Sequence, residues 1–185
     1  MSDTGKVVVN RAMSLDGFIA GPGDNMNWGS GRKLADFLDK DDFLAVAGAT
    51  GAMLVGRSTW EVGDKMEEEE PGSVDYPFSG PMFLLSHRPL DPPDPDVTIL
   101  SGDIREAVTT ALAAAGGKDL EILGADVAAQ CLGAGLVDEI LVYVLPVLLG
   151  DGVRFTPPGV GTIELEQISS KRSGDATMIR YRVRR

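Results

Sequence analysis

The sequence predicts an α/β protein whose sheet is parallel in the middle and antiparallel at its C-terminal edge. Short apolar segments alternate with segments of helical spacing through most of the chain, the order typical of parallel strands joined by helices. Near the end, segments 162–169 and 176–185 alternate with period two around a Ser/Gly/Asp turn, which favours an antiparallel hairpin. The length of 185 residues, without an internal repeat or linker, predicts a single domain over 1–185.

The elements of the first half follow from local patterns. The β-branched run 7–9 is typical of a strand, and the spacing of Leu34, Phe37 and Leu38 is helical. In chain order we expect a strand from Val7 that breaks at Asp16-Gly17 and resumes at Phe18 and Ile19, a helical region between Leu34 and Val46, a buried strand at 52–56, one or two helical turns at 57–63, and a polar loop at 64–80 that includes the solvated acidic run 67–70.

The second half repeats a strand–helix alternation. Ile104, Val108 and Leu112 share one helical face, Ser101 can cap that helix, and two glycines end it. In chain order we expect strands at 81–86 and 97–100 around a proline-rich loop at 87–96, a helix at 101–117, a strand at 119–123, a helix at 125–135, and a long apolar strand at the start of 136–150.

Composition excludes several functional classes. Hydrophobic residues make up 43% of the chain, the net charge is -11 and the pI is about 4.5. Such an acidic protein repels nucleic acid and anionic membranes, so a phosphorylated ligand has to be held by local donors. No segment reaches the roughly 18 apolar residues of a membrane span, and the N-terminus lacks a signal-peptide core. We therefore expect a soluble, cytoplasmic protein without nucleic-acid or membrane partners.

Single copies of cysteine and histidine exclude further chemistry. One cysteine, Cys131, forbids an intrachain disulfide, and with one histidine, His87, it excludes a Cys/His zinc cluster. Cys131 lies among alanines, as a buried small hydrophobic residue does. We expect no metal. The dinucleotide fingerprint GxGxxG after the first strand, the Walker lysine motif and GxSxG are all absent.

Polar residues follow several of the predicted strands, where open α/β sheets bind ligands. They are Asp16, the run Arg57-Ser58-Thr59, the run Ser86-His87-Arg88, and the run Gly124-Ala125-Asp126. The segments Gly56–Thr59 and Gly124–Val127 are strand-to-helix junctions, where free N–H groups and the helix dipole favour phosphate. Arg57 and Arg88 add cationic groups suited to phosphate oxygens. The pattern indicates a ligand with several phosphates, such as a dinucleotide.

Each of these features also has a purely structural explanation. Gly56 could simply end a strand before a helix that Ser58 caps, and Gly124 could allow close helix packing. Arg88 could be a surface residue of a loop. Asp16-Gly17 is a common turn dipeptide. Local sequence leaves both explanations open.

Six stretches together resemble the dihydrofolate-reductase-like superfamily, and most closely its riboflavin-biosynthesis reductase C-terminal domain family with stand-alone bacterial relatives. The stretches are SLDGFIA at 14–20, Asn27-Trp28, VGRSTWE at 55–61, LLSHR at 84–88, ILGADVAAQCLGAGLVDEI at 122–140 and PVLLGDGVRF at 146–155. They span nearly the whole chain in the family's order. The resemblance implies a three-layer fold with a mixed central sheet of about eight strands flanked by helices, with NADPH across the strand ends.

The resemblance also implies roles for individual residues. Its cofactor-binding residues would be Gly56, Arg57, Ser58 and Thr59 at the phosphates, Gly124, Ala125, Asp126 and Val127 at the pyrophosphate, Ser86 and Arg88 near the adenosine 2′-phosphate, and Ile19 and Ala20 beside the nicotinamide. Asp16 and Trp28 would face the substrate pocket as candidate catalytic residues. Among them, Asp16 would orient the substrate or relay a proton.

The sequence departs from the family pattern at two places. The second junction usually carries two glycines, and here the second is Ala125, whose methyl group narrows the approach of a pyrophosphate. Dihydrofolate reductases place a carboxylate on the helix a few residues after the tryptophan, where this chain has Lys33, with Asp36 a turn later. The zinc-binding deaminase domain usually fused to the riboflavin enzyme is also absent from this sequence.

The expected function is an NADPH-dependent reductase of a small polar heterocyclic substrate, similar to the 5-amino-6-(5-phosphoribosylamino)uracil reductase of riboflavin biosynthesis. Alternatives are a dihydrofolate reductase and a non-catalytic nucleotide-binding protein. The resemblance further implies a homodimer, with the apolar strand 140–145 near the interface.

Overall fold

The computed structural model describes residues 5–28, 32–70 and 76–184. Its strands are β1 (Val7–Ser14), β2 (Phe18–Ala20), β3 (Thr50–Gly56), β4 (Met82–Leu85), β5 (Val97–Leu100), β6 (Asp119–Leu123), β7 (Glu139–Leu145), β8 (Val153–Arg154), β9 (Leu165–Ser173) and β10 (Ala176–Val183). Its α-helices are α1 (Lys40–Ala49), α2 (Arg57–Glu69), α3 (Ile104–Ala114) and α4 (Ala125–Gly133), with short 3-10 turns at Pro22–Asp24 and Leu34–Asp36.

The main sheet has eight strands in the order β5-β4-β3-β6-β1-β7-β10-β9. All neighbours from β5 to β7 are parallel, β10 is antiparallel to β7, and β9 is antiparallel to β10. A separate two-stranded sheet pairs β2 with β8 in antiparallel register. The mixed eight-stranded sheet with a C-terminal antiparallel hairpin confirms the predicted fold class.

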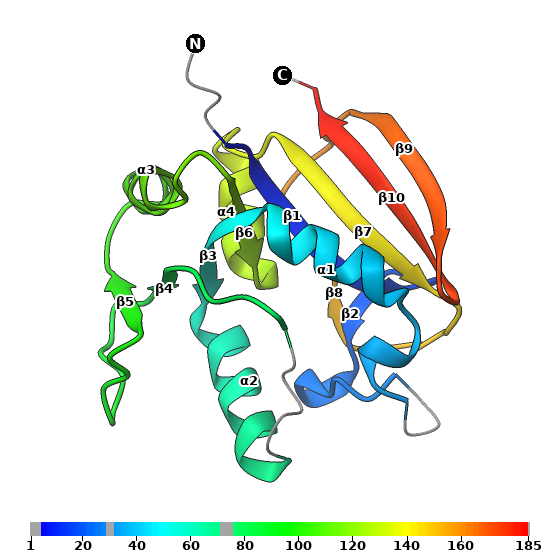
Figure 1. Ribbon diagram of the computed structural model, residues 1–185, viewed down its shortest axis with the longest axis horizontal. Helices are drawn as coiled ribbons and strands as arrows, with labels where there is room; N and C mark the ends of the chain where they lie inside the picture. The colour runs from blue at the N-terminus through cyan, green and yellow to red at the C-terminus, as the bar shows by residue number, and fades with distance from the viewer. Residues whose placement is uncertain (1–4, 29–31, 71–75, 185) are drawn as a thin grey trace.

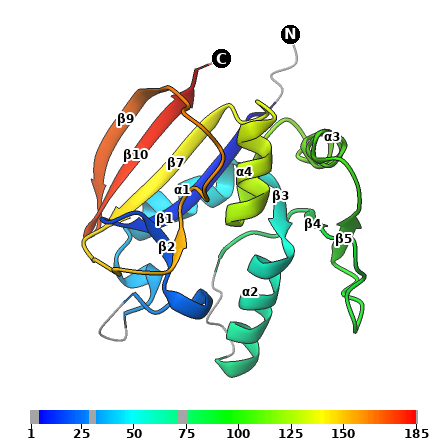
Figure 2. The ribbon, with the colours of Figure 1, turned by 180° about the vertical axis from the view of Figure 1, so that it is seen from behind.

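Helices cover both faces of the sheet because alternate strand residues face opposite sides. On β1, Val7 and Val9 join the core cluster that contains α3 and α4 residues, whereas Val8 joins the cluster with Trp28 and Phe37. Figure 1 shows α1 crossing the near face, and Figure 2 shows α4 against the opposite face. Each fully buried leucine in these layers contributes about 2 kcal/mol through the hydrophobic effect.

Helix α2 is longer than the sequence predicted, and this expectation was wrong. It runs for 13 residues, from Arg57 to Glu69, and takes in most of the acidic run expected in a loop. Glu, Lys and Met favour helices, and ion pairs Arg57–Glu61 and Lys65–Glu69 lie at i,i+4 spacing. The helix has no buried residues. Its sequence therefore lacks the stripe of buried apolar residues by which a helix is usually predicted.

Smaller corrections concern a cap and the helical region before α1. The N-cap of α3 is Asp103, whose Oδ1 accepts a hydrogen bond from Arg105 N at 2.8 Å, rather than Ser101. Leu34 lies in a 3-10 turn, and α1 begins only at Lys40 after Asp39 caps it. The spacing from Leu34 to Val46 looked like one continuous helical region. In the structure, Asp39 caps α1 and separates it from the 3-10 turn.

Candidate functional site

The two predicted phosphate junctions lie side by side at the carboxyl edge of the sheet. Strands β3 and β6 are parallel neighbours, with Val55 opposite Leu123. A Cβ atom placed on Gly124 would be 2.6 Å from Thr59 Oγ1 and 3.4 Å from Gly56 N. The structure therefore brings Gly56 and Gly124, which are far apart in the sequence, into direct proximity.

The helices that begin at these junctions have no side-chain caps. Helices α2 and α4 begin after Gly56 and Gly124, and neither has a side-chain cap among the residues that the structure describes. By contrast, Asp39 caps α1 and Asp103 caps α3. The free N–H groups and positive dipole ends of α2 and α4 can bind an anion.

Gly124 is required at its position by backbone conformation. Its φ of 97° lies in the left-handed region that favours glycine. A side chain there would also contact Thr59 below van der Waals distance. Close packing of the two junctions, one of the two open explanations, is thus confirmed, and it also brings the N-termini of α2 and α4 together.

Arg57 joins a third loop to the two junctions. Its Nη1 donates to Ser86 Oγ at 3.3 Å and to the carbonyl oxygens of Arg88 and Pro89, both at 3.1 Å, while Nε donates to Glu61 at 2.7 Å. Ser86 Oγ also accepts from Arg88 N at 3.1 Å. The loop after β4 is therefore held beside the N-terminus of α2.

Most predicted cofactor-binding residues accordingly occupy one region. The segments Gly56–Thr59 and Gly124–Val127 adjoin each other, and Ser86 and Arg88 adjoin Arg57. Ser58, Arg88 and Asp126 are exposed, whereas Val127 is buried and packs against Gly56. Their roles toward a cofactor stay predictions.

Arg11 is a residue of this region that the sequence analysis missed. It is 7% exposed and faces α4, with Nη2 donating to the Gly124 carbonyl and Nη1 donating to the Phe155 carbonyl at 3.3 Å. Burial lowers the pKa of Arg11 to about 10, although Asp126 and Cys131 partly oppose the shift. An arginine that follows Asn10 in the middle of a predicted buried strand was the available signal.

Asp16 links two loops at the same edge of the sheet. Its Oδ1 accepts from Ser14 Oγ at 2.6 Å and from Leu149 N at 3.1 Å, and its Oδ2 accepts from Gly150 N at 2.7 Å. Hydrogen bonds from Ser14 and then Gly150 lower the pKa of Asp16 to about 2. The carboxylate is therefore ionised at neutral pH, and its predicted role toward a substrate stays a prediction.

The residues expected beside the nicotinamide and substrate lie on and after β2. Ala20 is buried, Ile19 is half-buried, and both belong to the ribbon that β2 forms with β8. Trp28 is 2% exposed in the cluster with Phe37 and Tyr143. Trp28 Nε1 and the Tyr143 hydroxyl are buried and lack a hydrogen-bond partner among the described residues.

The carboxylate typical of dihydrofolate reductases has no counterpart in this region. Asp36 Oδ2 accepts from Lys33 N at 2.8 Å, which fixes the 3-10 turn. Lys33 Nζ forms an ion pair with Glu70 at 2.6 Å. Both side chains are thus engaged in local structure.

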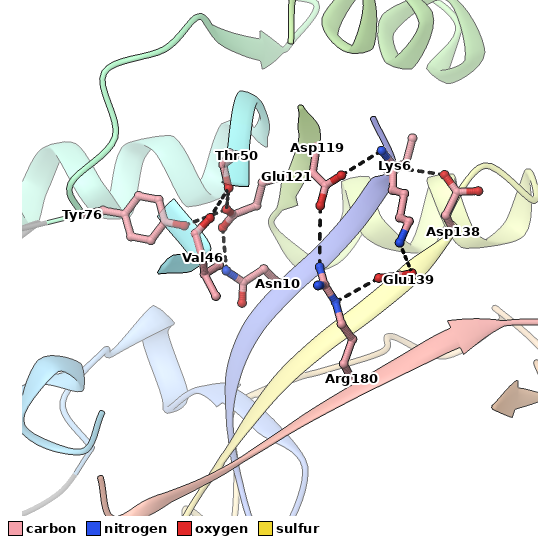
Figure 3. A network of polar contacts seen from close by, with 11 residues as sticks. Lys6, Asn10, Val46, Thr50, Tyr76, Asp119, Glu121, Asp138, Glu139 and Arg180 are labelled. Atoms are coloured by element: carbon pink, nitrogen blue, oxygen red, sulfur yellow. Dashed lines mark hydrogen bonds and ion pairs between the residues drawn. The ribbon is translucent and has the colours of Figure 1, made fainter. Parts of the chain in front are cut away.

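A second polar cluster lies on the α1 face of the sheet (Figure 3). Glu121 is 3% exposed and accepts hydrogen bonds from Asn10 at 3.0 Å, Thr50 at 3.0 Å and Tyr76 at 2.8 Å. Burial raises the pKa of Glu121, and the three donors oppose this. A cavity of about 200 Å³ borders this cluster and Arg180.

This cavity is not our candidate site. Most of the charged groups that line it have partners: Arg180 lies 3.6 Å from Asp119, Lys171 pairs with Asp42, and Glu121 accepts three hydrogen bonds from neutral donors. It also lies on the face opposite Arg11 and α4. The carboxyl-edge junctions have uncapped helices instead, which is why we place ligand binding there.

Two further findings concern the described residues only. Within 5–28, 32–70 and 76–184, no three His, Cys, Asp or Glu side chains are grouped so that they could hold a metal ion. In the same ranges, no helix has the length and apolar character needed to cross a bilayer.

Comparison with known proteins gives the family. The model of the RibD C-terminal domain matches residues 5–179. The chain belongs to the RibD C-terminal domain family. This confirms the resemblance drawn from the six sequence stretches. No curated protein matches the sequence.

Solved structures show the same fold. A protein from Shewanella sp. PV-4 assigned to riboflavin biosynthesis has a TM-score of 0.79 and 25% identity, covering 97% of this chain and 99% of that one. The dihydrofolate reductase of Enterococcus faecalis, complexed with NADP(H), has a TM-score of 0.65 and 14% identity, covering 98% of both chains.

A bifunctional protein from Thermotoga maritima has a TM-score of 0.67 at 14% identity. It is a diaminohydroxyphosphoribosylaminopyrimidine deaminase/5-amino-6-(5-phosphoribosylamino)uracil reductase. The match covers 98% of this chain, which spans only 57% of that protein. The family supports a reductase-like role in the riboflavin pathway, and the two neighbours at 14% identity show the fold.

Proposed function

We propose that the protein is an NADPH-dependent reductase of a small polar heterocyclic substrate, similar to the 5-amino-6-(5-phosphoribosylamino)uracil reductase of riboflavin biosynthesis. The observation that carries this proposal is the convergence of two uncapped helix N-termini, at Gly56 and Gly124, with Arg57 between them and the loop after β4. Family membership independently favours a reductase.

The residues at the carboxyl edge fit a phosphorylated cofactor. Free N–H groups of α2 and α4 offer donors to diphosphate oxygens, and glycines at both N-caps leave room for close approach. Arg88 is exposed beside Ser86 and suits the adenosine 2′-phosphate, which favours NADPH over NADH. When bound, NADPH supplies a hydride for reduction of an electrophilic carbon.

The chain itself contributes positioning and exclusion of water. Ile19 and Ala20 border the nicotinamide side, and the buried Trp28 lies on the substrate side of the same segment. Orientation of the two reactants accounts for most of the rate. Because Asp16 is ionised, we assign it to loop positioning, and the proton comes from water.

The direct test is titration of the protein with NADPH and NADH, followed by single-turnover assays with candidate pyrimidine and pterin substrates. We expect NADPH to bind more tightly than NADH and to be oxidised in the presence of a substrate of this class. If the protein did not bind NADPH at about millimolar concentration, its affinity would be far below that of most cofactor sites. That result would remove the proposal.

The same assays separate the alternatives. Loss of NADPH absorbance that depends on dihydrofolate would show a folate reductase. Normal NADPH binding by wild type and Asp16→Asn, without turnover of any candidate substrate, would favour a non-catalytic nucleotide-binding protein.

We also propose that the chain forms a homodimer. The expected contribution of strand 140–145 has to be revised, because β7 lies inside the sheet between β1 and β10 and is largely buried. Strand β9 is one of the two edges of the main sheet, the other being β5, and it exposes Leu165 and Ile168, a surface that favours association with another chain. Sedimentation at micromolar concentration should show twice the 19.6 kDa mass; a monomer alone would exclude pairing.

A further inference from the structure

Arg11 is a buried cation whose position the packing of the fold does not explain. It lies on β1 between core residues, yet its Nε has no hydrogen-bond partner among the described residues. The guanidinium carbon lies 5.6 Å from the centre of the Phe155 ring, close enough for a cation–π contact. A buried guanidinium with one unpaired donor is less favourable than an apolar side chain of similar size.

The electrostatic surroundings of Arg11 point to an anion. Its Nη2 contacts the Gly124 carbonyl at the start of α4, so the cation lies near the positive end of a helix dipole. This arrangement destabilises a helix by itself, since cations are favourable at the opposite end. Asp126 in the first turn offsets part of the charge. An anion bound at the N-terminus of α4 would be attracted by both the helix and Arg11.

The hydrogen bond from Arg11 to the Gly124 carbonyl also fixes the direction of the Gly124–Ala125 peptide group. The Gly124 carbonyl accepts from Arg11 Nη2 and from Ala128 N, the latter at 3.1 Å. In a planar trans peptide, the N–H points opposite to the carbonyl. The Ala125 N–H therefore points out of the helix N-terminus, where a ligand can accept its hydrogen bond.

We propose that Arg11 is a positioning residue for the diphosphate of the coenzyme. It holds the Gly124–Ala125 peptide with its N–H outward and places a buried positive charge behind the α4 N-terminus. The contact with the Phe155 carbonyl extends this support to the segment that follows β8. The inference rests on the proposed function, because NADPH is the diphosphate compound concerned.

The test compares Arg11→Met with wild type in calorimetric titrations with NADPH, ADP-ribose and 2′-AMP. Loss of the charge and of the hydrogen bond to Gly124 should weaken NADPH and ADP-ribose binding on the order of tenfold. Binding of 2′-AMP, which has no diphosphate, should not change. The ligand-free melting temperature should stay the same or rise, because a buried charge has been removed.

Two controls make the result decisive. Arg182→Met removes the same charge from an exposed residue on β10 that pairs with Glu166, and should leave all three affinities unchanged. Arg11→Lys keeps the charge but cannot contact the Gly124 and Phe155 carbonyls together. It should show a smaller loss of NADPH affinity than Arg11→Met. It also replaces Arg11→Met in the test if that variant does not fold.

The outcomes distinguish this inference from the proposed function. Wild-type protein that fails to bind NADPH would overturn the proposed function and this inference with it. Wild-type binding with unchanged NADPH affinity in the Arg11 variants would overturn the inference alone. An equal loss for 2′-AMP and NADPH would also overturn it, since it would indicate general damage rather than a diphosphate-specific role.

Discussion

Gly124 shows how one residue can determine both local structure and a binding site. Its positive φ and its approach to Thr59 exclude a side chain, and its carbonyl receives Arg11. The same residue begins α4 without a cap. The predicted phosphate junction at the start of α4 therefore requires a residue without a side chain at position 124.

Replacing Gly124 with alanine should destabilise the protein and abolish cofactor binding. The added methyl group would lie 2.6 Å from Thr59 Oγ1 at a φ of 97°, and such backbone strain costs about 1–3 kcal/mol. Thermal unfolding and NADPH titration measure the two effects. Gly133→Ala on the same helix is the control, because a Cβ there meets no atom within 4 Å. If Gly124→Ala bound NADPH as Gly133→Ala does, the assignment of the junction would be wrong.

Ala125 marks the departure from the family's pair of glycines. It is the first residue of α4 and is half-buried. Ala125→Gly should tighten NADPH binding, because the methyl group no longer limits the approach of the diphosphate. It should also lower the free energy of unfolding by up to about 1 kcal/mol, since glycine is the more flexible residue. Weaker NADPH binding in this variant would show that the methyl group aids the site.

At the scale of elements, the sequence predicted the strands well and the helix ends less well. Strands β3, β4, β5 and β6 occur close to their predicted positions, because short apolar runs between glycine and proline signals have few other solutions. Helix α2 was underestimated, since none of its residues is fully buried and its C-terminal half is acidic, as a solvated loop would be. The β2–β8 ribbon joins distant segments, which local patterns do not encode.

Asp16 connects the turn after β1 with the segment between β7 and β8, and its ionisation should appear in acid stability. Its pKa is lowered from 3.8 to about 2, so the stabilisation is present above about pH 4 and is lost as the pH falls toward 2. Asp16→Asn should therefore melt below wild type at neutral pH, and the difference should shrink in acid.

Asp151→Asn is the matched control for this pH series. Asp151 Oδ1 accepts only the adjacent Gly152 N at 2.8 Å among its hydrogen bonds within the described part of the chain. Because it has only this local contact, Asp151→Asn should give a small difference in melting temperature from wild type. A difference for Asp16→Asn that persists unchanged to about pH 2 would contradict the role of the ionised carboxylate.

At the scale of the whole molecule, the order of strands determines where function lies. Residues 56, 86 and 124 meet because β4, β3 and β6 are adjacent and parallel. These residues could be expected at one edge of the sheet from the sequence alone, since parallel strands end on the same side. The sequence could not show Arg11 beside them, nor the cluster around Glu121, because both depend on which face of a strand packs against which helix.

The buried Glu121 should make the stability of the whole folded molecule depend on pH. Burial raises its pKa above the ordinary 4.5, so the stabilisation is complete below about pH 4.5 and is lost as the pH rises through the raised pKa. Glu121→Gln removes the charge while keeping the shape. Its melting temperature should match wild type at about pH 4 and exceed it by a few degrees at about pH 8. Identical melting temperatures at both values would show that the three donors fully compensate burial.

The measurement that tests the central claim most directly is a crystal structure of the protein grown with NADPH. The account predicts that the coenzyme's phosphate groups contact the backbone N–H groups at the beginnings of α2 and α4, with the guanidinium of Arg11 behind the second contact. Density for the coenzyme elsewhere, for example in the cavity beside Glu121, would contradict it.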